Sequence, residues 1–202
     1  MKYKCITGGP IAENCYLLID EKTNKAAVID PGFLNETLLI EIKKHAVQKI
    51  LLTHGHFDHI WEADRLHEML GVPVCAYETE AAFAADDKQN GSLLMMDESI
   101  TCKVHETFKD GETFQIGEVP VTVLHTPGHT AGGVSYITPD AVFTGDTLMG
   151  YSVGRCDLPT GNSAELRESL KKLAALPGNP DICGGHGPIT TLEDEKRRNP
   201  YL

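Results

Sequence analysis

The apolar residues of this chain fall into short β-favouring runs that alternate with segments of helical periodicity. In the first half, residues 14–20 and 25–30 are two such runs joined by four polar residues, a pattern typical of a β-hairpin. Leucine and isoleucine residues recur at helical spacing across residues 34–46, which predicts an amphipathic helix. The other elements predicted for this half are strands at 49–53 and 74–77, helices at 60–70 and 78–85, and a segment at 86–97 that is either irregular or a short helical excursion.

The second half repeats the alternation of strands and helices. Gly117 and the pair Pro139-Asp140 are turn signals between apolar runs, and each predicts a pair of strands. The elements expected here are strand pairs at 112–116 with 119–124 and 133–138 with 141–144, helices at 163–176 and 191–198, and a short strand at 181–183. Because no linker rich in Pro, Gly or Ser interrupts this order, we predict one α/β domain spanning residues 1–202.

Composition narrows the classes of function. With 202 residues, 41% of them hydrophobic, the chain can bury one substantial core. Its formal net charge of -11 argues against a nucleic-acid partner, because binding phosphates requires a basic surface. An acidic exterior favours solubility and, around bound metal cations, also suits a small anionic substrate.

Cysteine usage and hydropathy predict a cytoplasmic protein. The six cysteines are scattered without a C-x-x-C pair, so no disulfide framework is expected and a reducing compartment fits. No run approaches the ~18 consecutive apolar residues that a membrane span requires. Residues 1–10 also lack the apolar core of a signal peptide. We therefore expect no membrane partner, and the sequence indicates no oligomeric state.

The most informative stretch is T-H-G-H-F-D-H at residues 53–59, directly after an apolar run. It brings three histidines and an aspartate together within six residues: His54, His56, Asp58 and His59. Imidazole nitrogens and carboxylate oxygens suit zinc, iron and manganese, so a cluster of this density predicts a metal site.

Three further ligand-type residues stand where an apolar strand runs into glycine. They are His129 in T-P-G-H-T, Asp146 in G-D-T and His186 in G-G-H-G. Because functional groups of α/β folds gather beyond the carboxyl ends of strands, we expect these loops to converge on the first cluster. Seven ligands are too many for one tetrahedral zinc and suit two ions with open positions. Asp146 is the natural candidate to bridge them, since a carboxylate can bind two cations.

These motifs resemble the metallo-β-lactamase fold superfamily, and within it the short form of the glyoxalase II group. The match runs from Ile29-Asp30-Pro31-Gly32 through the four ligand motifs, with support from Gly154-Arg155-Cys156-Asp157 and the terminal Asn-Pro-Tyr-Leu. The resemblance implies an αβ/βα sandwich with a dinuclear site along one edge. It also implies that Asp30 orients ligands or loops, although a plain role as a turn residue at a strand end remains open.

The resemblance also implies the ligand assignment. His54, His56 and His129 would hold one metal, and Asp58, His59 and His186 the other, with Asp146 between them. We expect two divalent ions, zinc first, with iron or manganese as alternatives. Asp58 and Asp146 are the carboxylates expected to take part in catalysis.

A hydroxide shared by two divalent metals is a nucleophile near neutral pH, and the metals can stabilise the oxyanion of a tetrahedral intermediate. The resemblance therefore implies hydrolysis of an anionic thioester of the hydroxyacylglutathione type. Arg155 is expected to bind the substrate's carboxylate, with a structural role in an ion pair with Asp157 as the alternative, and Tyr151 is expected to form a wall of the pocket. Full-length glyoxalase II continues into a helical domain that binds glutathione, whereas this chain ends at Leu202, so the thiol carrier is not fixed.

Three alternatives stay open. A persulfide dioxygenase would hold a single iron on His54, His129 and Asp146, since two histidines and one carboxylate leave positions open for oxygen. Lactone or β-lactam hydrolysis would use the same metal chemistry as the thioester reaction. A non-catalytic metal-binding protein is the third alternative, and it predicts bound metal without turnover.

Overall fold

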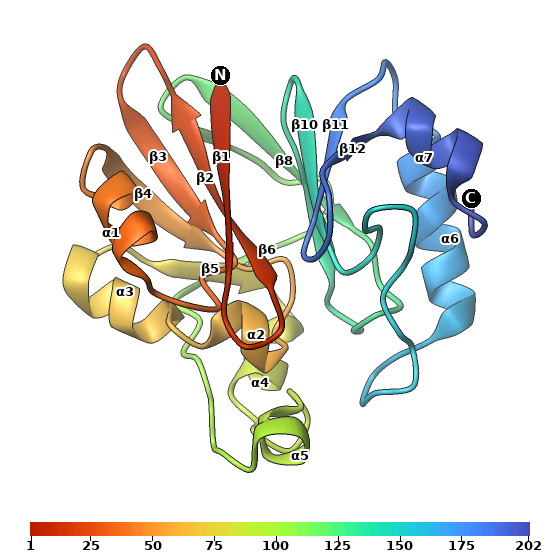
Figure 1. The fold of residues 1–202 in the computed structure, drawn as a ribbon, viewed down its shortest axis with the longest axis horizontal. Helices are drawn as coiled ribbons and strands as arrows, with labels where there is room; N and C mark the ends of the chain where they lie inside the picture. The colour runs from red at the N-terminus through yellow and green to blue at the C-terminus, as the bar shows by residue number, and fades with distance from the viewer.

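Two six-stranded mixed β-sheets face each other in the computed structural model, which describes all 202 residues (Figure 1). The first sheet contains, in spatial order, β1 (Lys2–Gly8), β2 (Glu13–Asp20), β3 (Lys25–Ile29), β4 (Ala46–Leu51), β5 (Val74–Tyr77) and β6 (Glu106–Phe108). The second contains β12 (Thr190–Thr191), β11 (Asp181–Gly184), β10 (Ala141–Gly145), β9 (Val134–Ile137), β8 (Val119–His125) and β7 (Thr113–Ile116). Each sheet therefore comes from one half of the chain.

Seven helices cover the outer faces and one edge of the two sheets (Figure 1). They are α1 (Glu36–Ile42), α2 (Phe57–Ile60), α3 (Ala63–Leu70), α4 (Glu80–Ala84), α5 (Ser92–Met96), α6 (Ser163–Ala174) and α7 (Leu192–Arg198). Figure 1 shows α1 and α3 against the first sheet and α6 and α7 against the second. This arrangement is the predicted αβ/βα sandwich. None of the helices has the length and apolar character that crossing a bilayer requires.

The core lies between the sheets and under the helices because the central strands bury both of their faces. All eight residues of β2 are buried, as expected for a strand covered on both sides. Its alternate residues serve different layers: Tyr16 packs edge-on against Phe143 of the second sheet, with ring centroids 5.3 Å apart. Leu17 faces the opposite way and joins the cluster beneath α1 and α3. Both halves of the chain thus share one interior.

The structure differs from the prediction in several element boundaries. The helix expected over residues 34–46 ends at Ile42, because the backbone of Ala46 already pairs with Asn24 and begins β4. The helix expected over 60–70 is interrupted, and its main part starts only at Ala63. The strands β1, β6 and β12 were not predicted from the pattern at all.

The carboxyl ends of β3, β4, β8, β10 and β11 point to the same edge of the sandwich, where α2 also lies (Figure 1). The loops that leave these strands carry all of the ligand-type residues predicted from the sequence. The fold therefore brings segments more than a hundred residues apart to one place.

Candidate metal centre

The first four ligand-type residues come from the loop after β4 and from the single turn of α2. The backbone amide of His59 donates to the carbonyl of His56, and the amide of Phe57 donates to the carbonyl of Asn90. These bonds fold the segment back on itself beneath the sheet edge. All four side chains, His54, His56, Asp58 and His59, are buried.

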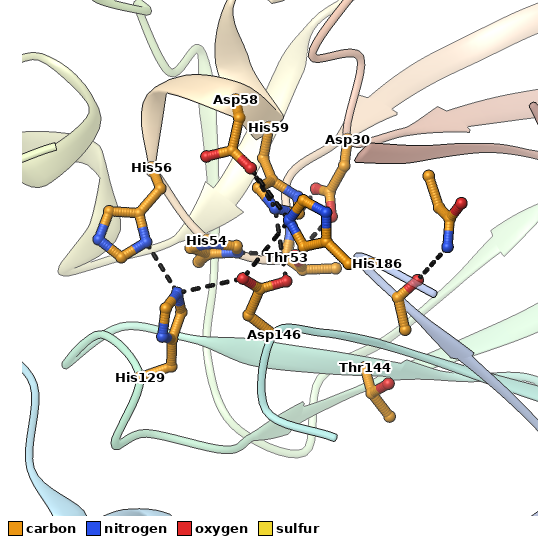
Figure 2. A network of polar contacts seen from close by, with 12 residues as sticks. Asp30, Thr53, His54, His56, Asp58, His59, His129, Thr144, Asp146 and His186 are labelled. Carbon is orange, nitrogen blue, oxygen red and sulfur yellow. Dashed lines mark hydrogen bonds and ion pairs between the residues drawn. The ribbon is translucent and has the colours of Figure 1, made fainter. Parts of the chain in front are cut away.

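The second sheet supplies three side chains that face this cluster (Figure 2). Nε2 of His129 lies 2.8 Å from Nδ1 of His56. Nε2 of His186 lies 3.1 Å from Oδ2 of Asp58. The structure therefore brings together all seven residues that the sequence singled out as ligands.

The seven side chains fall into two groups with a carboxylate between them. The candidate ligand atoms of His54, His56 and His129 lie within 4.8 Å of one another, and so do those of Asp58, His59 and His186. Asp146 reaches both groups, with Oδ2 3.5 Å from Nε2 of His129 and Oδ1 3.5 Å from Nε2 of His59. This geometry fits the predicted pair of sites with Asp146 as the bridge.

Several polar atoms at the centre are buried without a hydrogen-bond partner. They include Nε2 of His54, Nε2 of His59 and Oδ1 of Asp146. Buried polar groups are normally satisfied, so a set of unpaired donor atoms facing one point indicates cations. Nε2 of His56 is also unpaired, but the nitrogen of this ring that faces the cluster is Nδ1. The donor set thus fits divalent metals.

The pKa shifts in the cluster favour the protonation states that bind metal, which are neutral histidine and ionised aspartate. Burial holds the pKa of His54 well below its usual range and lowers that of His56 to about 3, so both rings are neutral. Burial would raise the pKa of Asp146, but the neighbouring His59 lowers it to about 2. The carboxylates of Asp58 and Asp146 raise the pKa of His59 against the effect of burial. Without metal, a proton on His59 supplies part of the positive charge that a cation would bring.

The protein holds the far side of the His129 and His59 rings. Nδ1 of His129 lies 2.7 Å from the carbonyl oxygen of Arg155, which leaves Nε2 facing the cluster. Nδ1 of His59 lies 3.1 Å from Oδ2 of Asp30. Hydrogen bonds of this kind fix the tautomer and the orientation of metal-binding histidines.

Asp30 also connects two loops at the sheet edge. Its Oδ1 accepts from the backbone amide of Thr53 at 2.7 Å, and its Oδ2 accepts from the Thr53 hydroxyl at 2.5 Å. The residue has a φ of 51°, in the left-handed region that few non-glycine residues adopt. These contacts support the role of Asp30 in orienting ligands over that of a simple turn residue.

Glycine is required where backbone passes directly behind a ligand. A Cβ atom on Gly185 would lie 2.3 Å from Oδ1 of Asp146, and one on Gly32 would lie 1.4 Å from the carbonyl oxygen of Asp58. Any side chain at either position would displace a ligand. This close approach explains the glycines in the P-G and G-G-H-G motifs.

Comparison with known families agrees with this geometry. The family described as the metallo-beta-lactamase superfamily matches residues 8–186. The chain belongs to the metallo-beta-lactamase superfamily. With its cluster of histidine and aspartate ligands, it is a metallo-hydrolase of that superfamily.

Two relatives of the superfamily align over almost the whole chain. A probable metallo-hydrolase of Bacillus subtilis, YqgX, is 36% identical over 208 residues, covering 100% of this chain and 98% of the relative. The hydroxyacylglutathione hydrolase GloC of Haemophilus influenzae is 34% identical over 199 residues, covering 94% of this chain and 92% of the relative. The predicted resemblance to the hydroxyacylglutathione hydrolase type is confirmed.

Two solved structures of the superfamily share the fold closely. BLEG-1, described as a B3 metallo-beta-lactamase, superimposes with a TM-score of 0.93 at 34% identity, over 100% of this chain and 99% of that one. TTHA1623, solved in a di-iron-bound form, gives 0.84 at 35% identity, over 98% of this chain and 100% of that one. The α/β sandwich predicted from the motifs is therefore confirmed.

The cluster of candidate metal ligands opens into a small pocket of about 100 Å³. Apart from candidate metal ligands and the Asn90-Gly91 turn, its lining is apolar and consists of Ile11, Phe57, Met95 and Leu158. No lysine or arginine reaches it. Positive charge that meets a substrate in this pocket would therefore come from bound metal or from the histidines of the cluster.

The two residues predicted to bind substrate lie outside this pocket. The Arg155 guanidinium donates to both oxygens of Asp157, at 2.6 Å and 2.7 Å. It lines a neighbouring cavity of about 600 Å³ together with Arg167. Tyr151 faces the C-terminal helix, where the Arg198 guanidinium lies 5.6 Å from its ring centroid. Roles in substrate binding for Arg155 and Tyr151 stay predictions.

Two buried carboxylates near the centre carried no motif and were missed. Both oxygens of Glu13 are buried without a partner, and burial raises its pKa well above the usual range. Glu80 is buried and accepts from the backbone amide of Gly55, between two of the histidine ligands. In the sequence, each of them is a single acidic residue without a motif, and only the fold shows that it is buried.

Proposed function

We propose that this chain is a dinuclear metal-dependent hydrolase of thioesters of the hydroxyacylglutathione type. The observation that carries the proposal is the pair of three-ligand groups with Asp146 between them. The similarity to GloC along most of both chains supports the choice of substrate class.

Bound divalent metals would supply water that ionises near neutral pH and positive charge for a reacting carbonyl. No serine, cysteine or lysine lines the pocket, so the chain offers no hydroxyl, thiol or amine nucleophile there. Hydrolysis by direct attack of water is therefore the expected route.

The two aspartates have different parts in this proposal. Asp146 is held ionised between the two ligand groups and sets their separation. Asp58 lines the pocket, and its contacts with His59 and His186 are made by Oδ2 alone. Its Oδ1 is then available to hold the attacking water and to accept a proton from it.

The lining of the pocket favours an uncharged group next to the thioester carbonyl. Ile11 and Met95 lie at its rim and are each almost half exposed, which leaves apolar surface for a substrate to cover. An anionic thiol carrier would extend beyond the rim. Arg155 and Arg167, in the neighbouring cavity, are our candidates to bind its carboxylates. Gly154 lines that cavity and packs directly against the ring of His129.

The test is a substrate panel on zinc-loaded protein, with the His56→Ala variant as the control for metal dependence. The panel contains S-lactoylglutathione, acyl thioesters of other thiols, a lactone, a β-lactam and glutathione persulfide. We expect thioester hydrolysis that His56→Ala abolishes while the variant stays soluble.

Other outcomes of the panel would reassign the function. Oxygen uptake by iron-loaded protein with glutathione persulfide as substrate would identify the chain as a persulfide dioxygenase. β-Lactam cleavage alone would follow the resemblance to BLEG-1. Metal binding without turnover of any compound would leave a non-catalytic protein.

A further inference from the structure

Glu80, the first residue of α4, is a carboxylate placed almost entirely out of water. Only 1% of its surface is exposed. Burial raises its pKa to about 7, although hydrogen bonds partly stabilise the ionised form. Burying a carboxylate is costly, so one that persists here must make interactions that the fold requires.

The partners of Glu80 come from both sheets. Its Oε1 accepts from the backbone amide of Gly55 at 2.9 Å. The Thr130 hydroxyl, which is buried without a hydrogen-bond partner of ordinary geometry, and the backbone amide of Gly132 lie near the same carboxylate and lower its pKa against the effect of burial. A Cβ atom on Gly132 would lie 2.3 Å from Oε2, so the backbone there passes directly beside it.

These partners flank one complete group of metal ligands. Gly55 stands between His54 and His56, and Thr130 directly follows His129. The loops belong to different halves of the chain, and Glu80 contacts both of them. One side chain thus ties together the backbone that carries the three-histidine group.

We propose that Glu80 is a positioning residue that holds His54, His56 and His129 at the separation a metal ion requires. It makes no hydrogen bond to the side chain of a candidate metal ligand, and it does not line the pocket. The affinity of the three-histidine site depends on it, whereas the site formed by Asp58, His59 and His186 does not. This inference rests on metal binding by the three histidines and is independent of the substrate.

The matched control is Glu195, a second carboxylate that is fully buried and satisfied by neighbouring residues. Its carboxylate accepts from the Tyr151 amide, the Thr190 hydroxyl and the Asn199 side-chain amide. None of these residues adjoins a metal ligand in the sequence. A purely structural buried carboxylate would behave as Glu195 does.

The experiment measures zinc affinity by competition with a chromophoric chelator, together with urea unfolding of the metal-free proteins. A His186→Ala background disables the second group, so that the titration reports the three-histidine site. We expect Glu80→Ala to weaken zinc binding by about 10- to 100-fold, the range seen when residues that orient ligands are removed. Glu195→Ala should lose stability and keep its zinc affinity within about twofold of the background.

Glu80→Gln keeps an acceptor for the Gly55 amide but presents a donor toward Gly132. We expect its zinc affinity to fall between those of the background and Glu80→Ala. The same zinc affinity in the background and in Glu80→Ala would overturn the proposal. If Glu80→Ala does not fold, unchanged affinity in Glu80→Gln would overturn it.

Discussion

Oδ2 of Asp30 lies 3.1 Å from Nδ1 of His59, and this contact turns Nε2 of the ring toward Asp58 and Asp146. The same carboxylate binds the backbone and side chain of Thr53, the residue before His54. Asp30 therefore fixes both a ligand and the start of the ligand loop.

Replacing Asp30 by asparagine should weaken metal binding by about 10- to 100-fold, because the His59 ring loses the partner that orients it. Asparagine tolerates the left-handed backbone at this position, so the change acts mainly on the hydrogen bonds. Chelator competition measures the effect. Asp20→Asn is the control, since Asp20 likewise accepts from a threonine hydroxyl and backbone amides, at a distance from the centre. Equal affinities in the two variants would count against the role of Asp30.

His186→Ala should lower the amount of bound zinc from two ions per chain to one, because His186 completes only the group that contains Asp58. The control is His125→Ala. His125 lies four residues before a ligand, but it stacks on Tyr77 and its Nε2 is engaged by the Ala131 carbonyl. Elemental analysis measures the number of zinc ions per chain in both variants. A His186→Ala protein that retains two zinc ions would exclude His186 as a ligand.

Met95→Glu should reduce kcat/KM for thioesters by at least about tenfold. The variant places a carboxylate on the apolar rim of the pocket, and a bound substrate would have to remove water from that charge. Leu94→Glu is the matched control, since Leu94 is the neighbouring residue of α5, is 72% exposed and does not line the pocket. Steady-state kinetics on one thioester suffices. Equal kinetics for the two variants would show that substrate does not cover Met95.

The metal-free protein should lose stability relative to Glu80→Gln as the pH rises from about 4.5 to 7. Burial raises the pKa of Glu80 from 4.5 to about 7, so the folded state binds the proton more tightly than the unfolded state does. The cost of ionising the buried group is absent below the unfolded pKa and fully present above about 7. It amounts to at most about 4 kcal/mol, since the pKa rises from 4.5 to about 7 and each pKa unit corresponds to about 1.4 kcal/mol.

Urea unfolding of both metal-free proteins across this pH range measures the difference. Glu80→Gln cannot ionise, so the difference in unfolding free energy between the two proteins should move in its favour as the pH rises. A difference that does not change with pH would contradict the perturbed pKa.

The sequence predicted the parts of the fold that are encoded locally. The strand at Val74–Tyr77 has the expected bounds, because a stop at Gly71 and a short apolar run define it. β1 was missed because the prediction relied on continuous apolar runs, whereas Lys2, Tyr3, Lys4 and Cys5 alternate between polar and apolar as in a half-buried strand. Its strand character comes from antiparallel pairing with β2, from Lys2 opposite Ile19 to Gly8 opposite Glu13.

In the candidate site, too, locally encoded features could be predicted and features that depend on distant contacts could not. His54 and its neighbours are dense enough in sequence to indicate a metal, and glycines mark the loops of the other three. Glu80 has no such signal, because its role depends on two loops about 25 and 50 residues away that meet only in the folded chain. The sequence places Arg155 in a loop near the site, but only the structure shows that its guanidinium forms an ion pair with Asp157 in the same loop.

The most direct test of the account is the number of metal ions that the wild-type protein binds. Metal-free protein would be incubated with excess zinc, passed through a desalting column and analysed for zinc and protein together. Two zinc ions per chain are predicted, one for each group of ligands around Asp146. A ratio that stays at one, whatever the excess of zinc, would contradict the dinuclear centre.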